Sequence, residues 1–150
     1  MLLRTLRVSP IVLFGLLGAI VGCSGPTAQK PVYAVNGKLT CQGKPMDRAQ
    51  ITFRLADDPN PRALGILARA DANGAYQVTT YKRFDGLPAG DYVVTIQWPE
   101  ARSNKSGLEE AESEDEIPPD RLKGAHSDPT KSKLRVTVGP RSNQIDFTLP

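Results

Sequence analysis

Alternation between apolar and polar residues over short runs is the property that most restricts how this chain can fold. The clearest run covers 91–98, where Tyr92, Val94, Ile96 and Trp98 occupy every second position. A period of two residues is typical of a β-strand with one buried face. Comparable but less regular runs lie at 33–39, 49–55, 64–69, 75–81, 134–138 and 145–149. The pattern predicts about seven strands and no amphipathic helix.

Residues that favour turns separate these runs. Gly, Pro, Asn and Asp gather at 42–45, 57–61, 73–74, 87–90 and 139–140. They supply the backbone angles that tight turns need. Each run has an inward apolar face and an outward polar face, as in sheets with one solvated side. Short strands separated in this way favour an all-β fold, an antiparallel β-sandwich formed by residues 32–150.

One long polar segment, at about 100–133, lacks the alternation. It contains the acidic run from Glu109 to Glu116, and the prolines at 118, 119 and 129 oppose regular structure. Runs of like charge usually stay solvated. A loop of this length inside a compact domain is either functional or disordered.

The N-terminus predicts export and membrane attachment. Arg4 and Arg7 precede an apolar run at 8–21, as in a secretory signal peptide. This run is shorter than the roughly 20 apolar residues of a membrane-spanning helix. The sequence Ile20-Val21-Gly22-Cys23 then resembles the lipobox of bacterial lipoproteins. That resemblance implies a diacylglyceryl group on the Cys23 thiol, cleavage before Cys23, and acylation of the new amine by a fatty acid such as palmitate.

Two alternatives to the lipoprotein interpretation stay open. The apolar run could be an uncleaved anchor, or an ordinary signal peptidase could leave Cys23 as a plain thiol. The state of Cys41 depends on this choice. If Cys23 carries lipid, Cys41 is expected to be a free buried thiol. If it does not, a Cys23–Cys41 disulfide is possible.

The expected organisation has three parts and one membrane attachment. Residues 1–22 are the lipoprotein signal peptide, 23–31 a lipidated polar tether and 32–150 the β-sandwich domain. Removing residues 1–22 takes away two of the 19 basic residues and lowers the formal net charge from +3 to +1. This balance predicts no basic face for nucleic acid. The predicted location is the bacterial cell envelope, at the outer membrane or its periplasmic face.

Three sequence elements resemble those of carboxypeptidase regulatory-like domains, which belong to the transthyretin-like and Cna-B-like sandwiches. They are the stretches 43–53 (GKPMDRAQITF), 70–78 (ADANGAYQV) and 87–94 (LPAGDYVV). The resemblance covers roughly residues 32–98, and 133–149 fits the two closing strands. It implies a Greek-key, transthyretin-like sandwich with a tight turn at 71–74. It implies fold and location and no particular reaction.

The sequence predicts no catalytic, metal or cofactor site. His126, the single histidine, stands beside Ser127 and Asp128, but neighbours in sequence do not make a catalytic triad. We expect a solvated loop histidine. The stretch 71–74 matches part of a calcium loop, yet Arg69 and Thr80 occupy positions that would need acidic ligands.

Two other residue sets have specific expectations. Trp98 is expected to cap the core, since a carbohydrate-binding face would normally expose several aromatic rings. The Cna-B resemblance suggests Lys38 and Asn143 as candidates for an isopeptide bond, although no inward acid is evident to catalyse its formation.

Three functional hypotheses follow. The first is a lipid-anchored, non-catalytic envelope module with a structural or protein-interaction role, docking a partner on an edge strand or through the acidic loop. The second is a small-molecule or carbohydrate-binding module that serves an envelope enzyme or transporter. The third, least favoured, is an enzyme that uses His126.

Overall fold

The computed structural model describes residues 29–58, 60, 63–100 and 118–150. These residues form an all-β structure and contain no helix. The strands are β1 (Val32–Tyr33), β2 (Val35–Cys41), β3 (Lys44–Pro45), β4 (Gln50–Leu55), β5 (Ile66–Arg69), β6 (Ala75–Gln77), β7 (Leu87–Pro88), β8 (Gly90–Gln97), β9 (Arg135–Val138), β10 (Asn143–Gln144) and β11 (Phe147–Leu149). Each of the seven predicted runs contains a strand, and four two-residue strands add to them.

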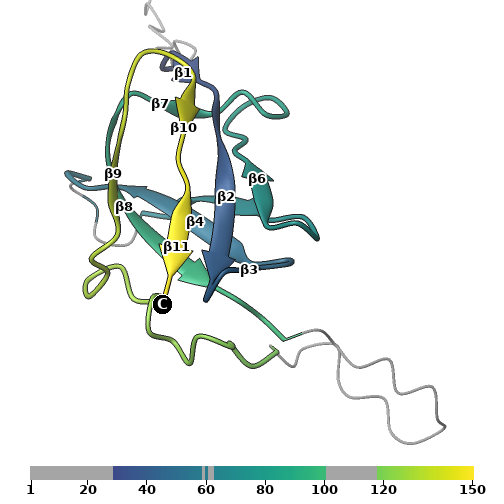
Figure 1. The fold of residues 1–150 in the computed structure, drawn as a ribbon. Helices are drawn as coiled ribbons and strands as arrows, with labels where there is room; N and C mark the ends of the chain where they lie inside the picture. Colours follow the sequence, from purple (N-terminus) through teal and green to yellow (C-terminus); the bar gives the residue numbers. More distant parts are fainter. Residues whose placement is uncertain (1–28, 59, 61–62, 101–117) are drawn as a thin grey trace, which may run out of the picture.

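Two larger sheets organise the molecule. One is antiparallel, in the order β5-β4-β8-β9. The other is built around β2, which pairs antiparallel with β6 and β3 and parallel with β10 and β11. The two short strands β1 and β7 form a separate pair. In Figure 1, β10 and β11 run beside β2, with β4 and β8 crossing behind them. The parallel pairing of the last two strands corrects the prediction of a wholly antiparallel arrangement.

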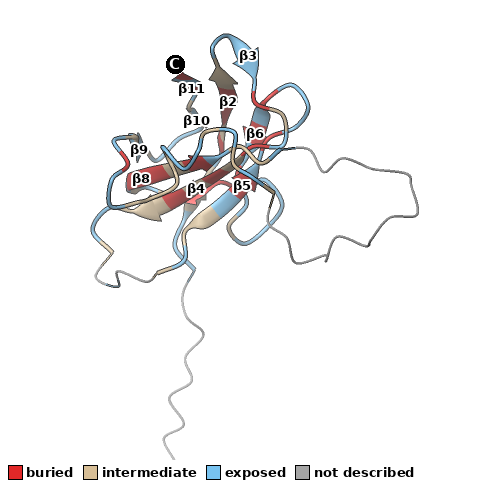
Figure 2. Ribbon diagram, turned by 90° about the horizontal axis from the view of Figure 1, so that it is seen from below, coloured by how far each residue is buried: buried red, intermediate tan, exposed pale blue. Residues whose placement is uncertain are grey.

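The two larger sheets share one apolar core. The ring of Phe53 on β4 lies 6.1 Å from that of Tyr76 on β6, which belongs to the other sheet. It meets Tyr92 on β8 edge-on at 6.3 Å. Figure 2 shows buried residues on β2, β4, β6 and β8. Alternate residues of the predicted runs therefore point inward, as their period of two requires.

The closing segment pairs with β2 as two short strands, β10 and β11, and a glycine and a tyrosine lie at the break between them. In the parallel pairing, Ile145 N donates to Asn36 O at 2.8 Å. The Ile145 carbonyl then accepts from the Tyr76 hydroxyl at 2.6 Å. Lys38 N donates instead to a carboxylate oxygen of Asp146 at 2.8 Å. A side chain at Gly37 would overlap the Ile145 carbonyl and approach the Tyr76 hydroxyl. These two side-chain bonds therefore take the place of backbone bonds to β2 at the break between β10 and β11.

The tyrosine hydroxyl in this arrangement stays protonated. Burial, with a smaller contribution from the negative charge of Asp146, raises the pKa of Tyr76 far above its ordinary value. A protonated hydroxyl is the donor that the Ile145 carbonyl requires.

The turn before β6 confirms the prediction for 71–74. Gly74 has a φ of 76°, which glycine adopts at little cost. One oxygen of Asp71 accepts from the backbone amides of Asn73 and Ala75 at 2.8 and 2.9 Å. The Asp71 side chain therefore stabilises the turn through bonds to neighbouring residues, as Asp side chains commonly do in turns.

Three details differ from the predictions. The strand expected over 75–81 ends at Gln77, because the chain then enters a loop held by the side chain of Asp85. Cys41 has no disulfide partner among the described residues and is only half-buried, since its side chain lies near the chain end, with Sγ 3.4 Å from the Pro150 carbonyl. The segment predicted as a turn at 87–90 contributes β7 instead, because Leu87 and Pro88 pair with β1.

Candidate functional site

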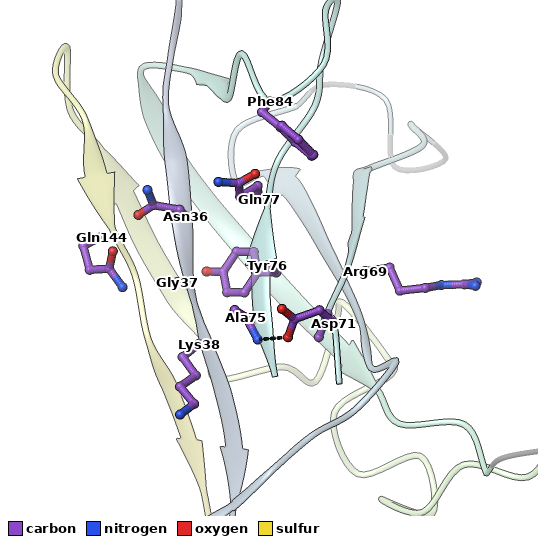
Figure 3. Close-up of a pocket in the computed structure, with 11 residues that line it drawn as sticks. Asn36, Gly37, Lys38, Arg69, Asp71, Ala75, Tyr76, Gln77, Phe84 and Gln144 are labelled. Carbon is purple, nitrogen blue, oxygen red and sulfur yellow. Dashed lines mark hydrogen bonds between the residues drawn. The ribbon is translucent and has the colours of Figure 1, made fainter. Parts of the chain in front are cut away.

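An open groove of about 780 Å³ lies over β6, β2 and β10. The register places Asn36 of β2 opposite Gln77 of β6 on one side and opposite Gln144 of β10 on the other. Residues opposite one another in a sheet project from the same face. Three carboxamides therefore form a row across three strands, which we call the carboxamide row (Figure 3). Its members are exposed or half-buried, so the row faces outward.

Lys38 lies on the same face, two positions beyond Asn36. Its register partner is Ala75, whose small side chain leaves the groove open beside it. The Lys38 side chain is exposed and forms no ion pair with any residue that the structure describes. The groove therefore presents a positive charge without an ion-pair partner, beside neutral hydrogen-bonding groups and with the carboxylates of Asp71 and Asp146 nearby.

Gln144 is held in place by a neighbouring acid. Its side-chain nitrogen donates to a carboxylate oxygen of Asp146 at 2.8 Å. The same oxygen accepts from the backbone of Lys38. This bond fixes one end of the carboxamide row, so less conformational freedom would be lost when Gln144 binds a ligand.

Phe84 stands at the end of the groove beyond Gln77 (Figure 3). The residue is 47 % exposed, and the Arg83 guanidinium lies 4.7 Å from the ring centre. Its φ is 63°, in the left-handed region, which is unfavourable for a bulky side chain. Strained residues of this kind tend to cluster at functional sites.

The loop that carries Phe84 is held by Asp85. One carboxylate oxygen accepts from Thr80 N at 2.7 Å, and the other accepts from Tyr81 N and Lys82 N at 2.9 and 2.7 Å. Partial desolvation raises the pKa of Asp85, but these backbone amides outweigh it and hold the pKa below its usual range. The ionised carboxylate is therefore the form that orders the loop.

We expect Asp85→Asn to loosen this loop and to remove part of the acid sensitivity of the fold. The wild type should be more stable than the variant by about 1 kcal/mol at neutral pH, because solvent weakens bonds to a partly exposed carboxylate. A lowered folded-state pKa gives stability that is present above the unfolded pKa and is lost as the pH falls toward the folded pKa. Urea unfolding of both proteins between about pH 7 and pH 3 measures the difference, which should shrink below about pH 4. A difference that is constant with pH would contradict the role of the charge.

The structure does not bring Ser127, His126 and Asp128 together as a catalytic triad. The Ser127 hydroxyl donates to the Gly124 carbonyl at 3.0 Å. The Asp128 carboxylate accepts from the amide and hydroxyl of Thr130 and pairs with Lys131. His126 is half-buried rather than fully solvated, and its backbone carbonyl accepts from Ile96 N. The His126 carbonyl joins this segment to β8, and the Ser127 and Asp128 bonds lie within the segment.

The contacts of Trp98 and Asn143 support the fold, and Lys38 is solvent-exposed. Trp98 caps the core as predicted: its indole N–H donates to the Asp47 carbonyl at 3.1 Å, and Arg121 stacks 4.8 Å from its ring. Lys38 and Asn143 are not placed for an isopeptide bond. Lys38 is exposed, and the Asn143 amide donates to the carbonyls of Gly139 and Arg141 in its own turn.

Several predictions fall on residues that the structure leaves out. Cys23, the signal peptide and the acidic run 109–116 lie outside the described residues. Among the residues that are described, no three His, Cys, Asp or Glu side chains gather as metal ligands. No helix in that part of the chain is long and apolar enough to cross a membrane.

Sequence reasoning missed the groove and its residues. Asn36, Gln77 and Gln144 each occupy an outward polar position, which by itself indicates only a solvated face. Their alignment depends on pairings between distant positions, because Asn36 is 41 residues from Gln77 and 108 residues from Gln144. The sequence signal that could have indicated the groove is the pair Tyr81 and Phe84, two aromatic residues in a polar loop. The structure shows that both are exposed.

Comparisons with protein-family models, curated proteins and solved structures found no match for this chain. The lipobox and the resemblance to carboxypeptidase regulatory-like domains therefore rest on the sequence motifs.

Proposed function

We propose that the protein is a lipid-anchored, non-catalytic module of the bacterial cell envelope whose main role is structural or protein-interacting. The lipobox-like sequence that ends at Cys23 supports the anchor. The observation that carries the interaction role is the open edge of β5, which ends the four-stranded sheet.

The proposed fold is a Greek-key, transthyretin-like β-sandwich. Its support is the order in which the chain visits the two larger sheets. It passes from β2 to β4 and β5, returns to β6, crosses to β8 and β9, and closes with β10 and β11 beside β2. Repeated crossing between two sheets with one shared core is typical of Greek-key sandwiches.

Within the described residues, no strand pairs with the outer edge of β5, which leaves outward backbone groups beside an apolar side chain. Ala70 N donates to Ala49 O at 2.8 Å, so the alternate residues Leu67 and Arg69 direct their N–H and C=O groups away from β4. Leu67 is 52 % exposed on the outer face. An exposed edge with an apolar side chain is suited to accept an extended segment of a partner as an added strand.

The proposal is tested on protein purified from membranes. We expect an intact mass that corresponds to Cys23–Pro150 plus acyl chains, and an unacylated chain from Cys23→Ser. Two or more acyl chains give stable attachment, because each buried CH₂ contributes about 0.8 kcal/mol. An unmodified wild-type mass would rule out the anchor.

The same preparation tests the edge. Proline at Leu67 removes an outward N–H that a partner strand needs, whereas valine keeps both the N–H and the apolar character. We expect an envelope protein that co-purifies with the wild type to be retained by Leu67→Val and lost with Leu67→Pro. Equal retention by both variants would exclude pairing at β5.

The carboxamide groove favours the second candidate function, a carbohydrate or small-molecule binding module serving an envelope enzyme or transporter. Sites for small ligands combine a concave surface with a few placed polar groups. The groove has both features, in addition to the exposed ring of Phe84.

A further inference from the structure

We propose that the groove over β6, β2 and β10 binds an acidic glycan, a chain of hydroxyl-rich sugar rings that carries carboxylates. The inference rests on the second candidate function and names its ligand class. It is carried by the carboxamide row, the Lys38 side chain and the strained, exposed ring of Phe84.

The carboxamide row suits hydroxyl groups. Each side-chain amide of Asn36, Gln77 and Gln144 has N–H donors and a carbonyl acceptor, with one N–H of Gln144 bonded to Asp146. A sugar hydroxyl can donate or accept. Neighbouring strands lie about 4.8 Å apart, so the row presents polar groups at regular intervals across the face. A chain of sugar rings laid across the strands would meet one amide after another.

Phe84 provides an apolar surface at one end of this row. Aromatic rings combine a large apolar face with low conformational freedom, which suits them to contact the apolar side of a ligand. The loop holds the ring exposed in spite of its positive φ, and Phe84 N donates to the Thr79 hydroxyl at 2.9 Å. A glycine at this position would relieve the backbone strain. The presence of a phenylalanine there is explained if the ring contacts a ligand.

Lys38 selects for negative charge. It is exposed on the same face and has no ion-pair partner among the described residues. The nearby carboxylates bond neutral amides and form no ion pair with Lys38: Asp146 accepts from Gln144 and from the Lys38 backbone, and Asp71 accepts from two turn amides. The Arg69 side chain extends away from the row (Figure 3). Lys38 is therefore the cation beside the carboxamide row, and Arg83 lies next to Phe84 at the end of the groove.

A glycan fits this face better than an acidic peptide does. An extended peptide gains affinity by pairing its backbone with a strand edge. Here β2 is paired along both edges, so a peptide that pairs its backbone would bind at the outer edge of β6 or β10 and not on the face that carries the carboxamide row. Hydroxyl groups, by contrast, need only the side-chain amides.

The test measures binding of the purified full chain by calorimetry. The probes are a hexamer of galacturonate, a neutral galactose hexamer and a short poly-glutamate peptide. We expect the galacturonate hexamer to bind at least ten times more tightly than the neutral hexamer, with an affinity that falls as salt rises. Equal or tighter binding of poly-glutamate would overturn the glycan assignment in favour of an acidic peptide. No binding of any probe would also overturn it.

Four variants locate the site. Lys38→Gln should reduce binding of the acidic hexamer about tenfold and leave the neutral hexamer unchanged, whereas Lys44→Gln, the same charge change on exposed β3, should alter neither. The double variant Asn36→Ala/Gln144→Ala should weaken both hexamers. Phe84→Gly should also weaken both without lowering the thermal midpoint. Equal effects of Lys38→Gln and Lys44→Gln would place binding elsewhere.

Mass spectrometry of the galacturonate hexamer after incubation distinguishes failure of the glycan assignment from failure of the proposed non-catalytic role. If mass spectrometry shows that the hexamer has been shortened during incubation, the non-catalytic role is wrong although glycan recognition stands. If no probe binds while the anchor mass and the β5 edge behave as expected, the glycan assignment alone fails.

Discussion

Gly37→Ala is expected to cost about 3–5 kcal/mol of the free energy of unfolding, because its new methyl group overlaps backbone. The overlap is with the Ile145 carbonyl, and the Tyr76 hydroxyl that bonds this carbonyl is also close. Neither group can move without loss, since the carbonyl lies in the chain that joins β10 to β11. We therefore expect the parallel pairing of the last strands with β2 to be disrupted.

A glycine in an open turn provides the matched control. Gly43 has a φ of 76° and nothing within 4 Å of the position that a side chain would take. Gly43→Ala should therefore cost about 1 kcal/mol, from backbone conformation alone. Urea unfolding compares the two variants, and hydrogen exchange at Phe147–Leu149 reports local detachment. If both substitutions cost the same and the amides of β11 stay protected, the close packing over Gly37 is not what holds the strand.

Phe53→Ala is expected to destabilise the fold by about 3–5 kcal/mol, as large-to-small changes of buried aromatic residues generally do. Phe53 is 1 % exposed and contacts Tyr76 in one sheet and Tyr92 in its own. Its loss would open a cavity where the two sheets meet. Burial raises the pKa of Tyr92 to about 12, with a smaller contribution from Tyr81, and the Tyr92 hydroxyl donates to the Pro88 carbonyl at 2.9 Å. Tyr92 is therefore unable to fill the cavity without losing that bond.

The same substitution on the surface separates burial from residue type. Phe84→Ala should change the free energy of unfolding by about 1 kcal/mol or less, because Phe84 is about half exposed and lies outside the core. Phe53→Leu, which keeps most of the volume, should cost about 1 kcal/mol. Thermal and urea unfolding measure all three. A Phe53→Ala cost close to that of Phe84→Ala would show that the sheets do not depend on this contact.

The strands and the tight turns follow from local sequence. Alternation at 91–98 predicts β8 and its buried face, because successive residues of a strand point to opposite sides. The turn at 71–74 is equally local, since Asp71 bonds amides only two and four residues away. The position of Trp98 over the core was also predicted, because a large apolar side chain at the end of a buried run packs against that core.

The groove and the parallel closing strands depend on tertiary structure. Whether β10 and β11 join β2 in parallel is decided by where the chain arrives after β9, which no local pattern encodes. The outward position of Asn36 is visible in sequence, but its neighbours Gln77 and Gln144 are set by register. Sequence by itself therefore determined the all-β character, the buried faces and the tight turn at 71–74 of this protein. Only the folded chain placed three carboxamides, a lysine and an exposed aromatic ring beside one another, because those contacts join segments that are distant along the chain.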